Sequence, residues 1–150
     1  MRHIKVLILF IVPICMVFKA KGMELEKIRI NYEKAVSDKE ICQAMIKQLS
    51  TNTDALHIAY LGAFQAVWAK HTINPISKLS TFKKGKKNIE LAVKSRPDDA
   101  EIRFVRLSVQ LNCPSFLGYS NKINEDKKIV QSNIHNIKSV VLKRMILVLI

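Results

Sequence analysis

A run of basic side chains is the strongest chemical feature of the sequence. The stretch FKKGKKNIELAVKSRP, which spans 82–97, holds six Lys or Arg in sixteen positions. Such a run could bind a polyanion or an anionic membrane, but no aromatic residue stands between the lysines to stack on bases. The simplest interpretation is a solvated helix face, and a nucleic-acid partner is disfavoured. If this face has a partner, that partner is anionic and contacts Lys83, Lys84, Lys87 and Lys94.

The spacing of cysteine and histidine does not indicate a catalytic or metal site. Cys42 and Cys113 could form a disulfide if their helices meet, although two thiols facing the core are the commoner outcome. A nucleophilic Cys-His pair needs an orienting third group, and no local pattern supplies one. His57 and His71 are about 21 Å apart on one expected helix, too far to share a metal ion. Because the sequence also lacks HExxH, a CxxC pair and a Gly-rich phosphate loop, we expect no enzyme, no cofactor and no metal site.

The composition sets the frame in which these residues must be positioned. The chain has 150 residues, of which 49% are hydrophobic and 25% charged, as in one ordinary globular domain. Its 25 Lys and Arg outnumber 12 Asp and Glu, which gives a formal net charge of +13. Only four Gly and four Pro are present, so turns are few and elements should be long. This pattern predicts an all-α protein rather than a sandwich of short strands.

The first 22 residues have the layout of a secretory signal. A basic start precedes an apolar run over 6–18, which is shorter than the roughly 20 residues that a membrane-spanning helix needs. We therefore predict that 1–22 form a signal peptide or a short N-terminal anchor. The protein is then exported, to the periplasm or the medium, where it could associate with a membrane. Cleavage stays open, because Phe18 occupies a position where a small residue is expected before a cut after Ala20.

The main domain, 23–138, is expected to consist of antiparallel helical hairpins. Apolar residues recur at three- and four-residue steps, which is typical of amphipathic helices. Asn74-Pro75 has the residue types that begin a helix, and Pro97 ends one. About six helices are predicted, over about 24–36, 38–49, 54–70, 75–94 and 99–112, and from 121.

Two helix starts resemble capping boxes. Ser37 is followed three residues later by Glu40, and Asp98 by Glu101. In this arrangement the first side chain accepts a hydrogen bond from a backbone N–H in the first turn, and the second side chain accepts one from the backbone N–H of the capping residue. We therefore predict N-caps at Ser37 and Asp98.

The expected helix faces predict which side chains point into the core and which point away from it. On the helix 99–112, Arg103, Arg106 and Gln110 share the face opposite the core. The loop over 115–120 should fold its aromatics back onto the protein, with an exposed recognition tip as the alternative. Three large residues are thus expected to point inward: Leu79, Phe116 and Tyr119.

The helix 54–70 carries a strip of small residues: Ala59, Gly62, Ala63 and Ala66. Small residues allow another helix to approach closely. Because Gly62 costs about 1 kcal/mol relative to Ala in a helix interior, a packing reason for it is favoured. The strip therefore predicts a tight helix pair.

Part of the chain resembles a tetratricopeptide repeat. Gly85, Ile89, Ala92 and Pro97 have the spacing of the second helix of such a repeat, and Leu61-Gly62 matches its first helix. The resemblance covers 54–110, although the segment between Gly62 and Gly85 is longer than in a standard 34-residue repeat. It implies a divergent helical hairpin that presents a face or groove to a protein or peptide.

A second resemblance covers nearly all of the chain after the leader. The stretches KHTINPISKLSTFKKG, EIRFVRLSVQLNCPSFLGY and NEDKK are similar to those of a group of short exported bacterial proteins. This resemblance implies an exported helical domain and brings no reaction with it.

The last twelve residues, 139–150, are apolar apart from a basic pair near their middle. Three interpretations stay open: a last helical turn packed on the core, a contact with the membrane interface aided by Lys143 and Arg144, or an aberrant terminus. Two functions follow for the whole protein. The first is a protein or peptide interaction module, and the alternative is a membrane-surface protein held by its basic face and apolar end.

Overall fold

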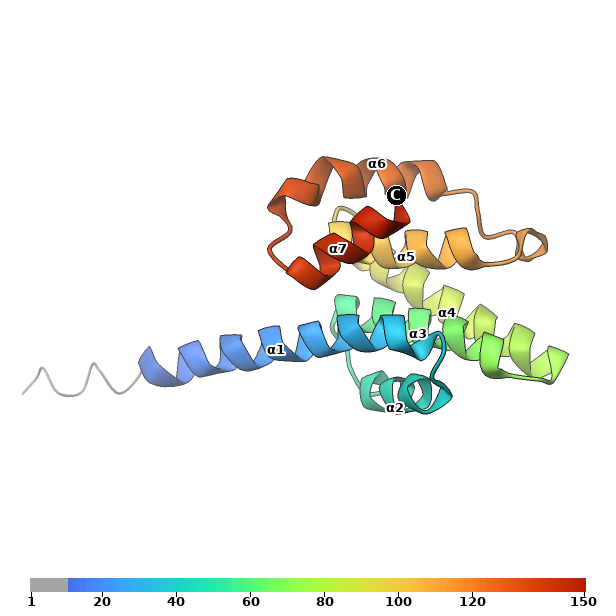
Figure 1. The fold of residues 1–150 in the computed structure, drawn as a ribbon, viewed down its shortest axis with the longest axis horizontal. Helices are drawn as coiled ribbons and strands as arrows, with labels where there is room; N and C mark the ends of the chain where they lie inside the picture. Colours follow the sequence, from blue (N-terminus) through green and yellow to red (C-terminus); the bar gives the residue numbers. More distant parts are fainter. Residues whose placement is uncertain (1–10) are drawn as a thin grey trace, which may run out of the picture.

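The computed structural model describes residues 11–150, with side chains from Gly22 onward except that of Met23. All regular structure in this range is helical, which confirms the all-α class (Figure 1). There are seven α-helices in the described part, where about six were expected. In chain order the elements are α1 (Ile11–Ala35), α2 (Lys39–Leu49), α3 (Ala55–His71), α4 (Pro75–Ser95), α5 (Ala100–Asn112), the 3-10 turn η1 (Ser115–Leu117), α6 (Ile123–Asn133), the 3-10 turn η2 (Ile134–Asn136) and α7 (Val140–Leu149).

The helix α1 begins at Ile11, well before the expected start at 24. Pro13 stands in its first turn, where a missing N–H breaks no helical bond, and a single glycine such as Gly22 is tolerated inside a helix. The expected signal segment 1–22 thus overlaps α1 from residue 11, and its first ten residues lie outside the described part. Within 11–150, none of the helices combines the length and the apolar character that a membrane crossing requires.

Both expected capping boxes are displaced by one residue. Asp38, not Ser37, caps α2 and accepts the Ile41 N–H at 3.0 Å. Asp99, not Asp98, caps α5 and accepts two backbone N–H groups. In each case a carboxylate sits at the helix start, where the macrodipole favours negative charge. The expected cap at Asn74 is confirmed.

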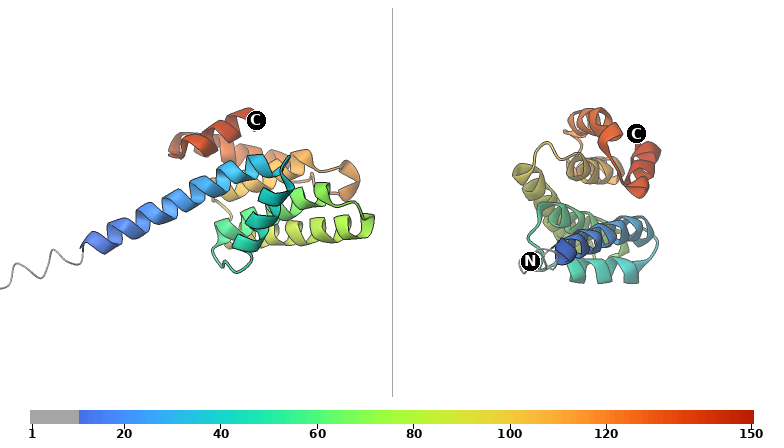
Figure 2. Two further views of the ribbon diagram at one scale, coloured as in Figure 1. Left: turned by 60° about the horizontal axis from the view of Figure 1, so that its bottom comes forward. Right: turned by 90° about the vertical axis from the view of Figure 1, so that its left-hand side faces the viewer.

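The central helix is α3, which contacts α1, α2, α4 and α5 (Figures 1 and 2). Its side chains Tyr60 and Phe64 are fully buried, and the ring of Tyr32 from α1 meets both edge-on. The contact with α4 is very close, because an added Cβ at Gly62 would lie 2.5 Å from the carbonyl oxygen of Gly85. The tight helix pair expected from the small-residue strip is therefore present.

A buried ion cluster fixes α6 on α5. Asp126 of α6 is fully buried, and its Oδ1 accepts hydrogen bonds from Arg103 Nη1 at 2.9 Å and Arg106 Nη2 at 2.7 Å. Its Oδ2 accepts from Arg106 Nε and Gln110 Nε2, both at 2.7 Å. Although burial alone would lower the pKa of Arg106, the hydrogen bond and charge of Asp126 raise it. The prediction that the three polar residues of α5 lie opposite the core was wrong, because α6 covers that face.

The loop after α5 buries one of its two aromatic rings and exposes the other. Tyr119 is buried and its hydroxyl donates to Glu90 Oε1 at 2.7 Å, as the inward prediction requires. Phe116 is 84% exposed, so the prediction is wrong for this ring. Gly118, at φ 60°, turns the chain between them in the left-handed region that glycine enters at little cost.

The apolar tail forms α7 and packs on the rest of the protein, as the first of its three interpretations proposed. Leu142, Met145 and Ile146 are buried, while Val148 remains 81% exposed. Arg144 of α7 donates two hydrogen bonds to the carboxylate of Glu33 on α1. The tail thereby links the last helix, α7, to α1.

Candidate functional site

The predicted basic face lies on the outer side of α4. Its four lysines, Lys83, Lys84, Lys87 and Lys94, are all exposed. Among the residues that the structure describes, no carboxylate forms an ion pair with any of them. None of the four lines the pockets described below, and their placement is that of an exposed helix surface.

Two cysteines and two histidines of the described part have separate surroundings. Cys42 and Cys113 are free, which excludes the disulfide between them. The buried Cys42 thiol donates to the Phe64 carbonyl at 3.3 Å, and burial raises its pKa to about 12. His57 bonds to a cap carboxylate and His71 to the Ala35 carbonyl, away from either thiol. The described residues contain no cluster of three metal-ligating side chains.

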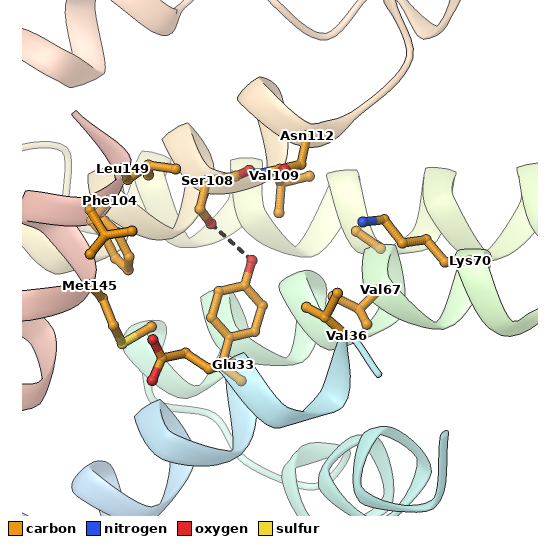
Figure 3. A pocket seen from close by; sticks show the side chains of 13 residues that line it. Glu33, Val36, Val67, Lys70, Phe104, Ser108, Val109, Asn112, Met145 and Leu149 are labelled. Carbon is orange, nitrogen blue, oxygen red and sulfur yellow. Dashed lines mark hydrogen bonds between the residues drawn. The ribbon is translucent and has the colours of Figure 1, made fainter. Parts of the chain in front are cut away.

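A central pocket of about 240 Å³ opens between α1, α3, α5 and α7 (Figure 3). Helices from both ends of the described chain supply its apolar walls: Val36, Val67, Phe104, Val109, Met145 and Leu149. The pocket exists because α7 lies across α1 and α5 without filling the space between them. It is open to solvent beside two side chains, Val36, which is 48% exposed, and Val148.

The polar groups of the central pocket are mostly engaged with each other. The Tyr32 hydroxyl and Ser108 Oγ are 2.9 Å apart, and burial raises the pKa of Tyr32 to about 12, so this hydroxyl is neutral (Figure 3). Asn112 Nδ2 donates to the Ser108 carbonyl at 2.8 Å, and Glu33 is held by an arginine. Lys70 is the remaining charged group. This arrangement can bind an apolar group.

A second pocket, of about 430 Å³, lies at the end of the molecule where α3 meets α4. We call it the end pocket. Its apolar lining comes from α4 and from the segment after α5: Pro75, Leu79, Phe82, Pro114, Phe116 and Leu117. The prediction that Leu79 points into the core is wrong, since it is 41% exposed at this pocket. The two pockets adjoin, because Ala66, Lys70 and Asn112 line both.

The chain matches no protein-family model, no curated protein and no solved structure. The site therefore rests on geometry alone. Sequence reasoning missed both pockets, because each joins segments far apart in the chain. The nearest sequence signal was Phe116, a large aromatic in a loop, for which an exposed recognition tip was the alternative.

Proposed function

We propose that this protein is an exported interaction module, tetratricopeptide-like in its hairpins, whose central pocket takes apolar side chains of a protein or peptide partner. The observation that carries this proposal is the pocket itself: an apolar hollow walled by four helices and open to solvent. Concave apolar sites with a few polar groups are the usual form of a binding site. The proposal assigns no reaction to the protein.

The size of the pocket limits how strongly it can bind alone. A pocket of about 240 Å³ accommodates one large apolar side chain, and burying such a side chain contributes about 1.5–3 kcal/mol. A specific complex needs further contacts, which Val36 and Val148 at the mouth can supply. Lys70, which also lines the pocket, can donate a hydrogen bond to a partner carboxylate or carbonyl. The partner is therefore expected to present an apolar anchor within a longer contact.

Two further features support the tetratricopeptide-like and exported parts of the proposal. The pair α3–α4 packs through Gly62 and Gly85, and Pro97 follows α4 before α5 begins, as in a helical hairpin followed by a second one. Export rests on the basic and apolar pattern of 1–22. Recovery of the protein from the cytoplasm alone, in the cell that makes it, would contradict export.

A peptide-display selection tests the proposed pocket. We expect peptides with a large apolar anchor to be enriched on the wild-type protein. Val36→Glu and Val148→Glu should each weaken the selected peptides at least tenfold in fluorescence anisotropy, because a carboxylate at the mouth is desolvated by the anchor. Both positions are exposed enough for the fold to tolerate the change.

The matched control for this selection is Leu91→Glu. Leu91 is 52% exposed on α4 and lines neither pocket. It should leave peptide affinity unchanged. Equal losses in all three variants, or no enriched peptide at all, would contradict the proposal.

A second candidate is membrane-surface binding by the basic face of α4 and by α7. It is favoured by the apolar side chains that α7 leaves outside, Val140, Leu147 and Val148, beside Lys143 and Arg144. Juxtamembrane lysines contribute on the order of 1 kcal/mol each at an anionic surface.

Neutralising three lysines of the basic face tests whether this face binds a membrane or is only a solvated surface. Changing Lys83, Lys84 and Lys87 to Gln should leave the free energy of unfolding within about 0.5 kcal/mol of wild type, since all three are exposed. If the face binds membrane, the same variant should bind phosphatidylglycerol vesicles more weakly at low salt. Unchanged vesicle binding would remove the membrane candidate, and a large stability loss would contradict the exposed placement.

A further inference from the structure

The end pocket is apolar in its walls and large enough for a small molecule. Its volume of about 430 Å³ lies within the range of about 300–1,000 Å³ that is typical of ligand sites. The turn between α3 and α4 and the η1 segment lie at the same end of the molecule (Figures 1 and 2) and supply its two sides. At its mouth, Phe116 presents most of its ring to solvent. A free apolar opening of this kind favours an apolar ligand.

The charges at the end pocket have one sign. Lys70 of α3 and Lys78 of α4 line it, and no carboxylate is among the lining residues in the described part of the chain. Within 11–150, neither lysine takes part in an ion pair. Two unneutralised ammonium groups beside an apolar hollow complement a ligand with an apolar body and an anionic head.

The floor of the end pocket is held in place from behind. The ring of Phe82 meets the ring of Tyr119 edge-on, with centroids 6.1 Å apart. Tyr119 is bonded to Glu90, which also accepts from Arg106 Nη1 at 3.1 Å. The floor of the end pocket is therefore supported by the same polar cluster that holds α6.

We propose that the end pocket binds a single-chain anionic amphiphile of the fatty-acid class, with the hydrocarbon chain against Leu79, Phe82 and Phe116 and the carboxylate between Lys70 and Lys78. The pocket suits such a chain better than a peptide, because a peptide backbone needs donors and acceptors. Apart from the lysines, the lining side chains offer few of these, and the Asn112 amide nitrogen already donates to Ser108. This inference concerns a different pocket from the one proposed for a protein or peptide partner, although Lys70 lines both.

Binding of dodecanoate to the full chain tests the inference. We expect saturable displacement of a dansyl-labelled fatty acid by dodecanoate below its micelle concentration. The neutral analogue 1-dodecanol should bind at least tenfold more weakly, since it carries no negative charge and cannot form an ion pair with the lysines. The double variant Lys70→Gln/Lys78→Gln should lose the same tenfold for dodecanoate and little for 1-dodecanol.

Matched variants on α4 distinguish this site from general attraction to a basic protein. The double variant Lys83→Gln/Lys87→Gln removes the same amount of charge from α4 outside the pocket, and should leave dodecanoate binding within about twofold. Phe116→Glu should abolish binding by placing a carboxylate at the mouth, whereas Leu91→Glu should not. Equal losses in both lysine pairs would overturn the proposal, as would binding to anionic vesicles without any binding of monomeric dodecanoate.

Cys113 supplies a readout that does not depend on the fluorescent probe. It lines the end pocket, whereas Cys42 is buried elsewhere. Saturating dodecanoate should slow alkylation of Cys113 by N-ethylmaleimide at least several-fold, as followed by peptide mass mapping. An unchanged rate at Cys113 would place the ligand outside the end pocket and overturn the assignment.

Discussion

Replacing Asp126 with alanine is expected to destabilise the protein by about 3–5 kcal/mol. Removing one partner of a buried ion pair has this cost because the remaining charge stays buried and uncompensated. Arg103 and Arg106 are 6% and 3% exposed, so neither guanidinium can turn to water without moving α6. Gln110 would lose its acceptor as well. A loss of this size is a large fraction of the 5–15 kcal/mol by which proteins are normally stable.

Local unfolding of the Asp126→Ala variant should begin in α6. Among its side chains, only Asp126 and Val130 are fully buried, so the ion cluster supplies much of its attachment to α5. Glu125 and Glu90 also bond the two arginines, at 2.7 Å and 3.1 Å, and they can offset part of the loss. Hydrogen exchange of the α6 amides should therefore accelerate before that of α3.

Denaturant melts of Asp126→Ala and Glu125→Gln measure the effect with its control. Glu125 is 43% exposed in its side chain, and pairs of this kind contribute about 0–1 kcal/mol. Glu125→Gln should thus change stability by no more than about 1 kcal/mol. Equal melting of Asp126→Ala and wild type would show that the arginines find water or another carboxylate at no cost.

The helices could be predicted from the sequence because their signals are local. The three- and four-residue apolar steps place five helices between 24 and 112, and Asn74-Pro75 marks the start of α4 correctly. The predicted caps at Ser37 and Asp98 were wrong by one residue, because an aspartate directly follows each of them. Which of two neighbouring polar residues adopts the extended cap conformation depends on how the chain enters the helix.

The buried face of α5 could not be predicted from α5 alone. Arg103, Arg106 and Gln110 repeat at helical spacing, as a solvated face does, and only the return of α6 makes the face internal. The sequence did carry one signal, which is that the basic residues of α5 are arginines and not lysines. Arginine forms bidentate, partly buried pairs more readily than lysine. The five arginines between 29 and 144 all pair with carboxylates, whereas the lysines of α4 pair with none in the described chain.

The pockets were beyond sequence reasoning for a related reason. The central pocket depends on where α7 lies against α1, and these helices are more than a hundred residues apart in the chain. The apolar tail permitted three interpretations, because its composition is compatible with a core, a membrane surface or an aberrant end. Leu79 and Phe116 have core-forming side chains, and their exposure appears only when the α3–α4 turn and η1 are placed together.

Replacing Gly62 with leucine should also destabilise the protein strongly, by about 3 kcal/mol or more. A Cβ at this position would lie 2.5 Å from the Gly85 carbonyl oxygen and 2.8 Å from Ile89 Cγ1. The first of these atoms belongs to the backbone of α4, so relief requires the two helices to separate. Overpacking of a close core contact commonly costs 1–3 kcal/mol, and loss of the α3–α4 contact adds to it.

Gly62→Ala tests the same contact by the sign of its effect. Helix propensity alone predicts that alanine stabilises an interior helical position by about 1 kcal/mol, whereas the close approach to Gly85 predicts a loss. Gly22→Ala is the control, because nothing lies within 4 Å of the Cβ that it adds to α1. In thermal melts of the full chain, Gly62→Ala should therefore lower the melting temperature and Gly22→Ala should not. A higher melting temperature for Gly62→Ala would mean that α3 and α4 can move apart at little cost, and that the small-residue contact does not fix this helix pair.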